Sequence, residues 1–251
     1  MMRLSFFIIL ISSYSLSLLA DDTAVTLENH LGPEPLTAGE QLLSQFSYPA
    51  VTRAAVHAAM YWQQSLSCIT CHTNGFYLIG RARSGSQAPA YLEARNFAHD
   101  FIKPHVDPDH QTKGTRTPGA EAMVATTAFL AISDMKIKGS LSETTRQAFD
   151  YIWRIQSDSG AWEKWIKCNW GPYESDDHFG VSLVALALGV ASRDEYTQSP
   201  QAAEADQRLK KFLRSHPPES LHQKGMLLWA AGYRNDLVKK NVVKKWQDEL
   251  L

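Results

Sequence analysis

Residues 181–191 are almost wholly apolar with no polar side, and they constrain the fold more than any other stretch. A helix that is apolar all round is buried by neighbours on every side. The preceding segment, 142–156, is different, because Phe149 and Trp153 recur at helical spacing and give it one apolar face. Ser142 has the side chain of an N-cap. An amphipathic outer helix, a Gly- and Trp-containing loop and a buried inner helix together predict one unit of a layered helical barrel.

The same alternation recurs along the chain. Inner, buried helices are expected to begin near residues 75, 120, 177 and 221, at spacings of about 45, 57 and 44 residues, a helical-hairpin period. Outer helices are expected over 48–65, 89–103, 142–156, 202–214 and 236–251, with a further helix over 38–46. No strand pattern is evident. We therefore predict an all-α chain of about four to five helix pairs. Its inner helices 120–134, 177–191 and 221–231 should be nearly fully buried and roughly parallel.

The first twenty residues have the pattern of an export signal. Arg3 supplies a positive start, residues 4–19 are apolar, and Ala20-Asp21 is a cleavage point. An uncleaved anchor is the alternative, although about 16 residues are short for a membrane span. We expect a signal peptide over 1–20, a linker or extended arm over 21–38, and a single domain over 39–251. The mature chain would have no transmembrane span and would be periplasmic or secreted.

Composition excludes one class of partner. The chain has 25 basic and 26 acidic residues, so its charge gives no reason to expect nucleic acid binding. Apolar residues make up 44% of the sequence, enough to fill a sizeable core.

The segment 142–156 ends in Gln156-x-x-x-Gly160-x-Trp162. This pattern resembles the QW repeat of the squalene–hopene cyclases and related terpenoid cyclases, whose superfamily includes the protein prenyltransferases. The resemblance implies an α/α toroid, in this chain an incomplete one. It also implies that the Gln side chain bonds free groups at the next helix terminus, that the Trp stacks under it, and that the glycine makes the tight corner.

An acidic cluster, Glu174-Ser-Asp176-Asp177, comes directly before the buried helix. It resembles the Asp-x-Asp-Asp motif of the same cyclases, although Glu174 replaces the first Asp and His178-Phe179 replace the usual Thr-Ala. Neighbouring carboxylates raise one another's proton affinity. By resemblance, Asp176 is the proton donor of an isoprenoid cyclase-like enzyme, supported by Glu174 and Asp177. The alternative is a group of acids that only interacts with the helix dipole.

Cys68-Ile-Thr-Cys71-His72 has the spacing of a c-type haem attachment motif, in which two thiols add to the vinyl groups and the His binds iron. Export to an oxidising compartment agrees with haem attachment. A disulfide is one alternative, and tetrahedral zinc held by the three cysteines and a His is another. The third cysteine is Cys168. Candidates for a second axial ligand are His178, His222 and Met226.

In a toroid, every link from an outer to an inner helix lies on one rim. This geometry places the Cys68–His72 motif, Cys168, the acidic cluster, His178 and His222 on the same rim, with Cys168 mostly buried.

Three hypotheses for the function follow. The first is an exported toroid carrying haem c, with a redox or ligand-sensing role. The second is an isoprenoid cyclase-like enzyme acting through Asp176, and the third is a non-catalytic toroid domain with a disulfide or zinc at its cysteines. Partners that fit are a redox protein and an isoprenoid or other apolar small molecule.

Overall fold

The computed structural model describes residues 25–32, 44–67, 69, 73–106, 119–163, 165, 168–170 and 173–250, with the backbone alone for 168–170 and 173–175. The predicted signal peptide, Cys68, Cys71 and His72 lie outside the described residues. Within them the chain forms nine α-helices and a short 3-10 helix: α1 Tyr48–Leu66, α2 Asn74–Arg81, α3 Pro89–Val106, α4 Ala120–Ile137, α5 Glu143–Arg154, α6 Asp177–Val190, η2 Glu195–Gln198, α7 Pro200–Ser215, α8 Leu221–Ala231 and α9 Lys240–Leu250.

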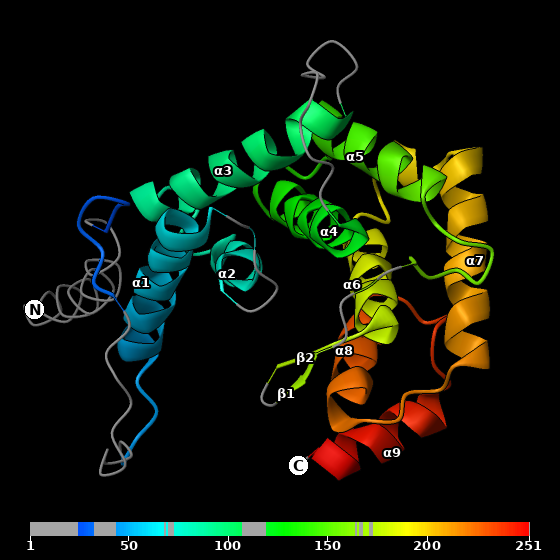
Figure 1. Cartoon of the computed structure of the whole chain (residues 1–251). Helices are drawn as coiled ribbons and strands as arrows, with labels where there is room; N and C mark the ends of the chain where they lie inside the picture. The colour runs from blue at the N-terminus through cyan, green and yellow to red at the C-terminus, as the bar shows by residue number, and fades with distance from the viewer. Residues whose placement is uncertain are drawn as a thin grey trace, which may run out of the picture.

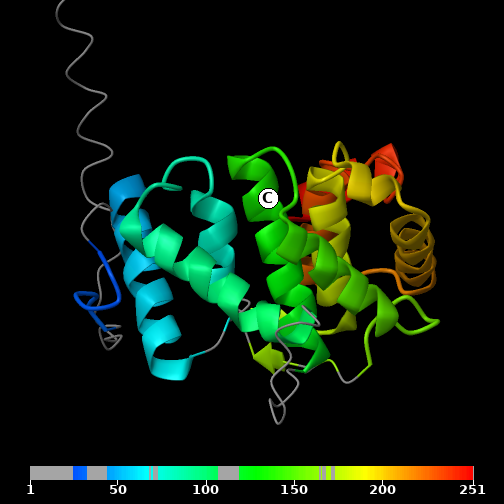
Figure 2. The same cartoon turned by 90° about the horizontal axis from the view of Figure 1, so that it is seen from above.

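The helices form two layers bent into an open arc (Figure 1). The inner row is α2, α4, α6 and α8, each packed against the next, and α3, α5 and α7 are neighbours in the outer layer. The first outer helix, α1, packs against α2 and α3, while α9 packs against α8 at the far end. Seen from above, α2, α4 and α6 run side by side (Figure 2). The all-α prediction and its alternation of outer and inner helices are confirmed.

The inner helices begin where the sequence predicts, at Asn74, Ala120, Asp177 and Leu221. Inner helices contact one another start to start and end to end, which shows that they run roughly parallel. Near their starts, the rings of Phe179 on α6 and His222 on α8 stack with centroids 5.6 Å apart. At the other end, Lys136 Nζ in the last turn of α4 donates a hydrogen bond of 3.1 Å to the Tyr233 hydroxyl, just after α8. The predicted parallel direction is therefore confirmed.

Burial of the inner helices is confirmed for α4 and α6 and is wrong for α8. Consecutive residues are buried from Met123 to Asp134 on α4 and from His178 to Gly189 on α6. On α8 only Met226, Leu227 and Ala230 are buried, and Trp229 is 37% exposed. The physical reason is position: α8 is the last of the inner row in the described chain, so α6 covers one of its sides and no further inner helix covers the other.

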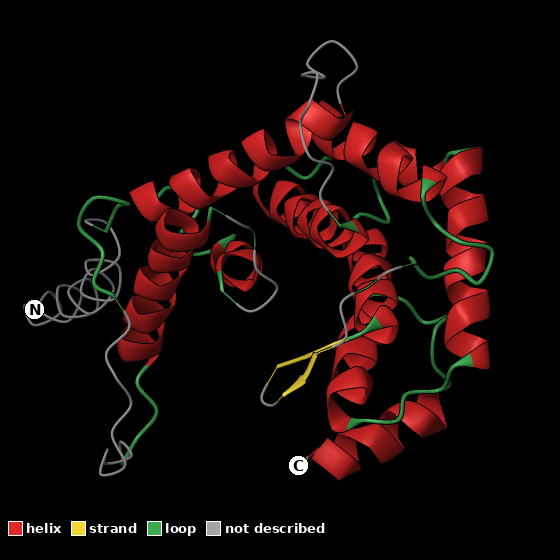
Figure 3. Ribbon diagram, in the orientation of Figure 1, coloured by secondary structure: helices red, strands yellow, loops and turns green. Residues whose placement is uncertain are grey.

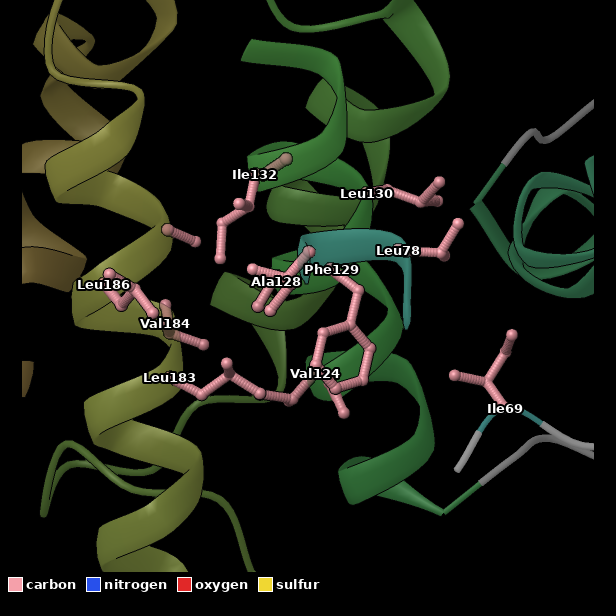
Figure 4. Close-up of a cluster of buried hydrophobic side chains, with 14 of the residues drawn as sticks. Ile69, Leu78, Val124, Ala128, Phe129, Leu130, Ile132, Leu183, Val184 and Leu186 are labelled. Atoms are coloured by element: carbon pink, nitrogen blue, oxygen red, sulfur yellow. The ribbon is translucent and has the colours of Figure 1, made fainter. Parts of the chain in front are cut away.

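The hydrophobic core lies between the inner helices and extends to the outer layer. Figure 4 draws part of it, with Leu78 of α2, Phe129 of α4 and Leu183 of α6. Ile69, in the link between α1 and α2, belongs to the same buried cluster. Close approach of α2 to α4 depends on Gly75, because a Cβ there would lie 2.2 Å from the Phe129 ring. Through these contacts the inner helices share one continuous hydrophobic core.

A buried carboxylate ties α4 to the outer layer. Asp134 is fully buried, pairs with the guanidinium of Arg95 on α3, and accepts from the Ser142 amide at 2.8 Å and the Thr145 hydroxyl at 2.7 Å. Burial would raise the pKa of Asp134, but these hydrogen bonds outweigh it and lower the pKa. The Ser142 side chain also accepts from the Thr145 amide at 3.3 Å, so the predicted N-cap of α5 is confirmed.

Several helix boundaries differ from the sequence predictions. Residues 44–46, within the predicted helix 38–46, are not helical. Outer helix α3 continues past the predicted end to Val106, with Pro104 inside its last turn. The last helix, α9, starts at Lys240 rather than 236, because the guanidinium of Arg234 pairs with the carboxylates of Asp206 and Asp236 and holds a turn there.

Part of the predicted linker folds onto the array. The Leu27 amide donates to Glu93 of α3 at 2.8 Å, and its carbonyl accepts from the Gln64 side chain of α1 at 3.1 Å. The Leu31 amide donates to His57 Nδ1 at 3.0 Å, and Val25 is buried. Residues 25–31 thus form an arm that lies on α1 and α3.

A small β-hairpin precedes α6 and was not predicted. Strands β1, Cys168–Trp170, and β2, Tyr173–Ser175, pair antiparallel, with Cys168 opposite Ser175 (Figure 3). Three-residue strands are too short to display an alternating pattern, which is why periodicity missed them. The only local signal is Gly171-Pro172 between the two strands, a dipeptide typical of turns. In the described part of the chain, no helix is long and apolar enough to cross a bilayer.

Candidate functional site

The Gln156–Trp162 corner joins α5 to the side of α7. Gly160 has a φ of +96°, which favours glycine, and a Cβ there would lie 2.0 Å from the backbone oxygen of Arg208. The Gln156 side chain donates to the Gly160 carbonyl at 3.0 Å and to the Ala205 carbonyl at 3.4 Å, and it accepts from Arg208 Nε at 2.9 Å. Ala205 is in the middle of α7, so the Gln contacts the side of the next outer helix and not its terminus.

Trp162 lies under this corner and is buried. Its indole ring stacks on Trp153 with centroids 6.3 Å apart, and its Nε1 donates to the Ile152 carbonyl at 2.9 Å. The predicted stacking partner was Gln156, and the observed partner is a second indole. The glycine corner and the core position of Trp153, Trp162 and Trp165 agree with the sequence prediction.

Asp176 is the N-cap of α6. Its Oδ1 accepts from the Phe179 amide at 2.8 Å, and its Oδ2 accepts from Gln223 Nε2 of α8 at 2.6 Å. Both carboxylate oxygens therefore accept hydrogen bonds, which is the arrangement of a capping residue near the positive end of a helix. Asp177 lies in the first turn of α6. The side chain of Glu174 lies outside the described residues, and its part in the acidic cluster stays a prediction.

His178 is buried and faces the outer layer. Its ring lies 6.3 Å from that of Phe212 near the end of α7, and its Nδ1 is 3.3 Å from the Ser182 hydroxyl. Its Nε2 is buried without a hydrogen-bond partner among the described atoms. Burial lowers the pKa of His178, and the nearby Asp176 carboxylate offsets this only in part. The structure therefore presents His178 as a buried ring turned toward α7, with a pKa below its ordinary value.

The other two candidate axial ligands are on α8. His222 stacks on Phe179 of α6, and Met226 is buried one turn further along. Trp229 follows His222 by seven residues, so His222, Met226 and Trp229 form one stripe of the helix. His178 and this stripe thus face different parts of the array.

A pocket lies where the four inner helices end, away from the predicted site. It has a volume of about 230 Å³ and apolar lining residues from all four inner helices: Phe76, Ile79, Ile132, Leu186, Val190 and Trp229. Arg83, Lys136 and Tyr233 add polar groups, and Gly80 completes the wall. Sequence reasoning missed this pocket because each helix contributes only one to three of its residues, and no local motif marks them.

Asp176 and the pocket are at opposite ends of α6. Leu186, a lining residue, follows Asp176 by ten positions, which is about 15 Å along a helix axis. A carboxylic acid at Asp176 is therefore not placed to protonate a molecule in this pocket. The structure brings Asp176, Phe179, His222 and Gln223 together, and it separates them from the cavity.

The cysteine predictions fall mainly outside the described residues. The backbone of Cys168 opens β1, which precedes α6 as expected, but its side chain is not described. Its predicted burial, and its proximity to Cys71, stay predictions. Among the residues whose side chains are described, no three His, Cys, Asp or Glu form a group that could hold a metal ion.

Comparison with known proteins matched no family model, no curated protein and no solved structure.

Proposed function

We propose that the protein is an exported helical-array protein that carries haem c covalently at Cys68 and Cys71, with His72 as an axial ligand and a redox or ligand-sensing role. The motif Cys68-x-x-Cys71-His72 and the leader-like residues 1–20 suggest both the cofactor and the compartment in which it is attached. A redox protein or a small apolar ligand would be the partner. Zinc or a disulfide is the alternative use of these cysteines.

The observation that carries this proposal is the burial of Ile69, which lies between the two cysteines of the motif. Ile69 is 5% exposed and belongs to the main core cluster. The motif also lies between two fixed points: Ser67, in the left-handed conformation (φ 48°), ends α1, and buried Asn74 starts α2. The apolar core beside Ile69 would offer the porphyrin a low-dielectric surface on which to rest.

The second axial ligand is proposed to come from α8. His222 and Met226 share a stripe with Trp229, whereas His178 is turned toward Phe212 of the outer layer. Haem c proteins use either His or Met in this position. Among the three sequence candidates, the orientation of His178 makes it the least suitable.

We also propose that the open arc is an incomplete α/α toroid resembling that of the terpenoid cyclases. The alternation of inner and outer helices and the left-handed corner at Gly160 support it. Gln156 departs from the expected repeat, since it contacts the middle of α7.

Haem attachment is tested by producing the full chain in a periplasm equipped with the cytochrome c maturation machinery. The proposal expects a Soret band that survives acid–acetone extraction and is lost in Cys68→Ser/Cys71→Ser. Cys168→Ser is the matched control and should keep the band. Colourless wild-type protein would discard the proposal. Thiol alkylation with mass mapping, and zinc analysis of the same sample, then separate a disulfide from a zinc site.

Ligation is tested in the same preparation. His72→Ala should convert the haem spectrum to that of a weakly ligated iron. Of His222→Ala and Met226→Ala, one should convert a low-spin to a high-spin spectrum, while His178→Ala should not. A spectral change in His178→Ala alone would contradict the assignment to α8.

The isoprenoid cyclase hypothesis has less support. Both oxygens of Asp176 are engaged, and the pocket lies at the far end of α6. Asp176→Asn keeps one accepting oxygen, so the fold is expected to persist. Loss of about 10²–10⁴ in turnover of a squalene-like polyene in that variant would revive the hypothesis.

A further inference from the structure

The pocket at the ends of the inner helices has the size and lining of a small-molecule site. Its volume of about 230 Å³ equals that of roughly eight water molecules at about 30 Å³ each, so an apolar body of roughly eight to ten carbon atoms is the right size. The rings of Phe76 and Trp229 bound it, nearly parallel with an angle of 22° and centroids 6.3 Å apart. Trp229 is 37% exposed, so a ligand that covers it removes apolar surface from water.

The charged side chains of the pocket are all cations. Arg83 and Lys136 are among the lining residues, and no Asp or Glu is. Lys136 donates to the Tyr233 hydroxyl at 3.1 Å and lies 5.3 Å from the centroid of that ring, and among the described residues no carboxylate pairs with it. Arg83 is exposed and has no ion pair within the described residues. Two cations beside an apolar cavity favour an organic anion.

The helix dipole is a competing explanation for these charges. Lys136 is in the last turn of α4, where a cation interacts favourably with the helix C-terminus. The basic residue in the last turn of α2, however, is Arg81, which bonds the Tyr48 and Ser84 hydroxyls. Arg83 lies beyond that turn and lines the cavity instead. Its charge is not accounted for by the end of α2.

We propose that this pocket binds a small organic anion with an apolar body, such as an aromatic carboxylate. The body packs against the stacked rings of Phe76 and Trp229, and the carboxylate lies between Arg83 and Lys136. The proposal goes beyond haem attachment and does not depend on it, because the pocket is measured with the ligand alone.

The test is a calorimetric titration of the full-length protein with 2-naphthoate and with its neutral analogue 2-naphthamide. Gly80→Leu is the blocking variant: an added Cβ at Gly80 meets nothing within 4 Å, so the new side chain can fill the pocket without a clash. Gly225→Leu is the matched control, since Gly225 also lies on an inner helix with open space around it but does not line the pocket. Circular dichroism of each variant verifies folding.

Wild-type protein should bind 2-naphthoate, Gly80→Leu should weaken binding about tenfold or more, and Gly225→Leu should leave it unchanged. Arg83→Gln/Lys136→Gln should lose about tenfold in affinity for naphthoate and little for naphthamide, because only the carboxylate uses the cations. No binding of naphthoate at millimolar concentration, or equal binding by Gly80→Leu, would overturn the site. Equal affinity of wild type for both probes would overturn its preference for anions.

Discussion

The side-chain amide of Gln223 donates a 2.6 Å hydrogen bond to the carboxylate of Asp176 and so joins the N-termini of α6 and α8. Gln223 is itself part of a capping box, accepting from the amides of Ser220 at 3.3 Å and Glu219 at 2.6 Å through Oε1. Asp176 caps α6 through the Phe179 amide. The residue that resembles a proton donor is thus an acceptor that connects two inner helices, and its first measurable role is in stability.

Asp176→Ala is expected to lower the free energy of unfolding by about 2–3 kcal/mol, because it removes an N-cap worth about 1 kcal/mol and a hydrogen bond to a charged group. Combined with Gln223→Ala in a double-mutant cycle, the coupling energy should be about 1 kcal/mol. Urea denaturation measures all four proteins. Asp248→Ala, an exposed acid on α9, is the control and should change stability by less than about 0.5 kcal/mol. Strictly additive effects would show that the two side chains do not interact.

Gly160→Ala should destabilise the protein by more than about 3 kcal/mol. Alanine must adopt a φ of +96°, and its Cβ would lie 2.0 Å from the Arg208 oxygen. The cost of backbone strain and the cost of the clash with α7 therefore add together. Gly80→Ala is the matched control: its Cβ meets nothing within 4 Å, and alanine should stabilise α2 by about 0.5–1 kcal/mol. Thermal denaturation distinguishes the two. A Gly160→Ala protein of wild-type stability would mean that the corner is not as close-packed as described.

Asp134→Asn should cost about 3 kcal/mol of stability, because it leaves the mostly buried Arg95 without its counter-ion and keeps only one of the two oxygens that accept from Arg95, Ser142 and Thr145. Glu204→Gln breaks a surface ion pair with Arg208, in which the Glu side chain is 75% exposed, and should cost less than about 0.5 kcal/mol. Guanidinium denaturation at neutral pH compares them. Equal losses in the two variants would contradict the central role of Asp134.

His178 should make stability depend on pH in the weakly acidic range. Burial holds its pKa below the ordinary value of about 6.5, so as pH falls the unfolded chain binds a proton first. The stability associated with neutral His178 is therefore present above about pH 6.5 and is lost as pH falls through the lower pKa of the folded state. His178→Phe keeps a ring against Phe212 and should lose less stability between pH 8 and pH 5 than wild type. The other histidines titrate in both proteins, so an identical loss would sink this assignment.

Much of the fold was predictable because its signals are local. A helix as apolar as residues 181–191 must be covered by other helices on all sides. In the structure, α6 is buried from His178 to Gly189. Ser142 and Gly160 also act through their own neighbourhood, one as a helix cap and the other as a left-handed corner. Such signals depend on the types of a few neighbouring residues, and these can be read directly from the sequence.

Other features depend on which helices become neighbours. Residues 226–231 of α8 are all apolar, yet Trp229 is partly exposed because the described inner row ends there. The hairpin Cys168–Trp170 with Tyr173–Ser175 was too short for its pattern to be recognised. The sequence named His178 as one of three candidate iron ligands. Its packing against Phe212, which turns the ring toward the outer layer, is visible only in the tertiary structure.

By itself, the sequence determined the helices, their alternation and the starting points of the inner row, since periodicity and capping are properties of adjacent residues. The tertiary structure alone decided that Asp176 bonds to Gln223, and that Phe76 and Trp229 face one cavity with Arg83 and Lys136. These residues are far apart in the chain, and they meet because each inner helix packs against the next in the same direction. A contact of this kind is a property of the helix arrangement, and no single helix contains it.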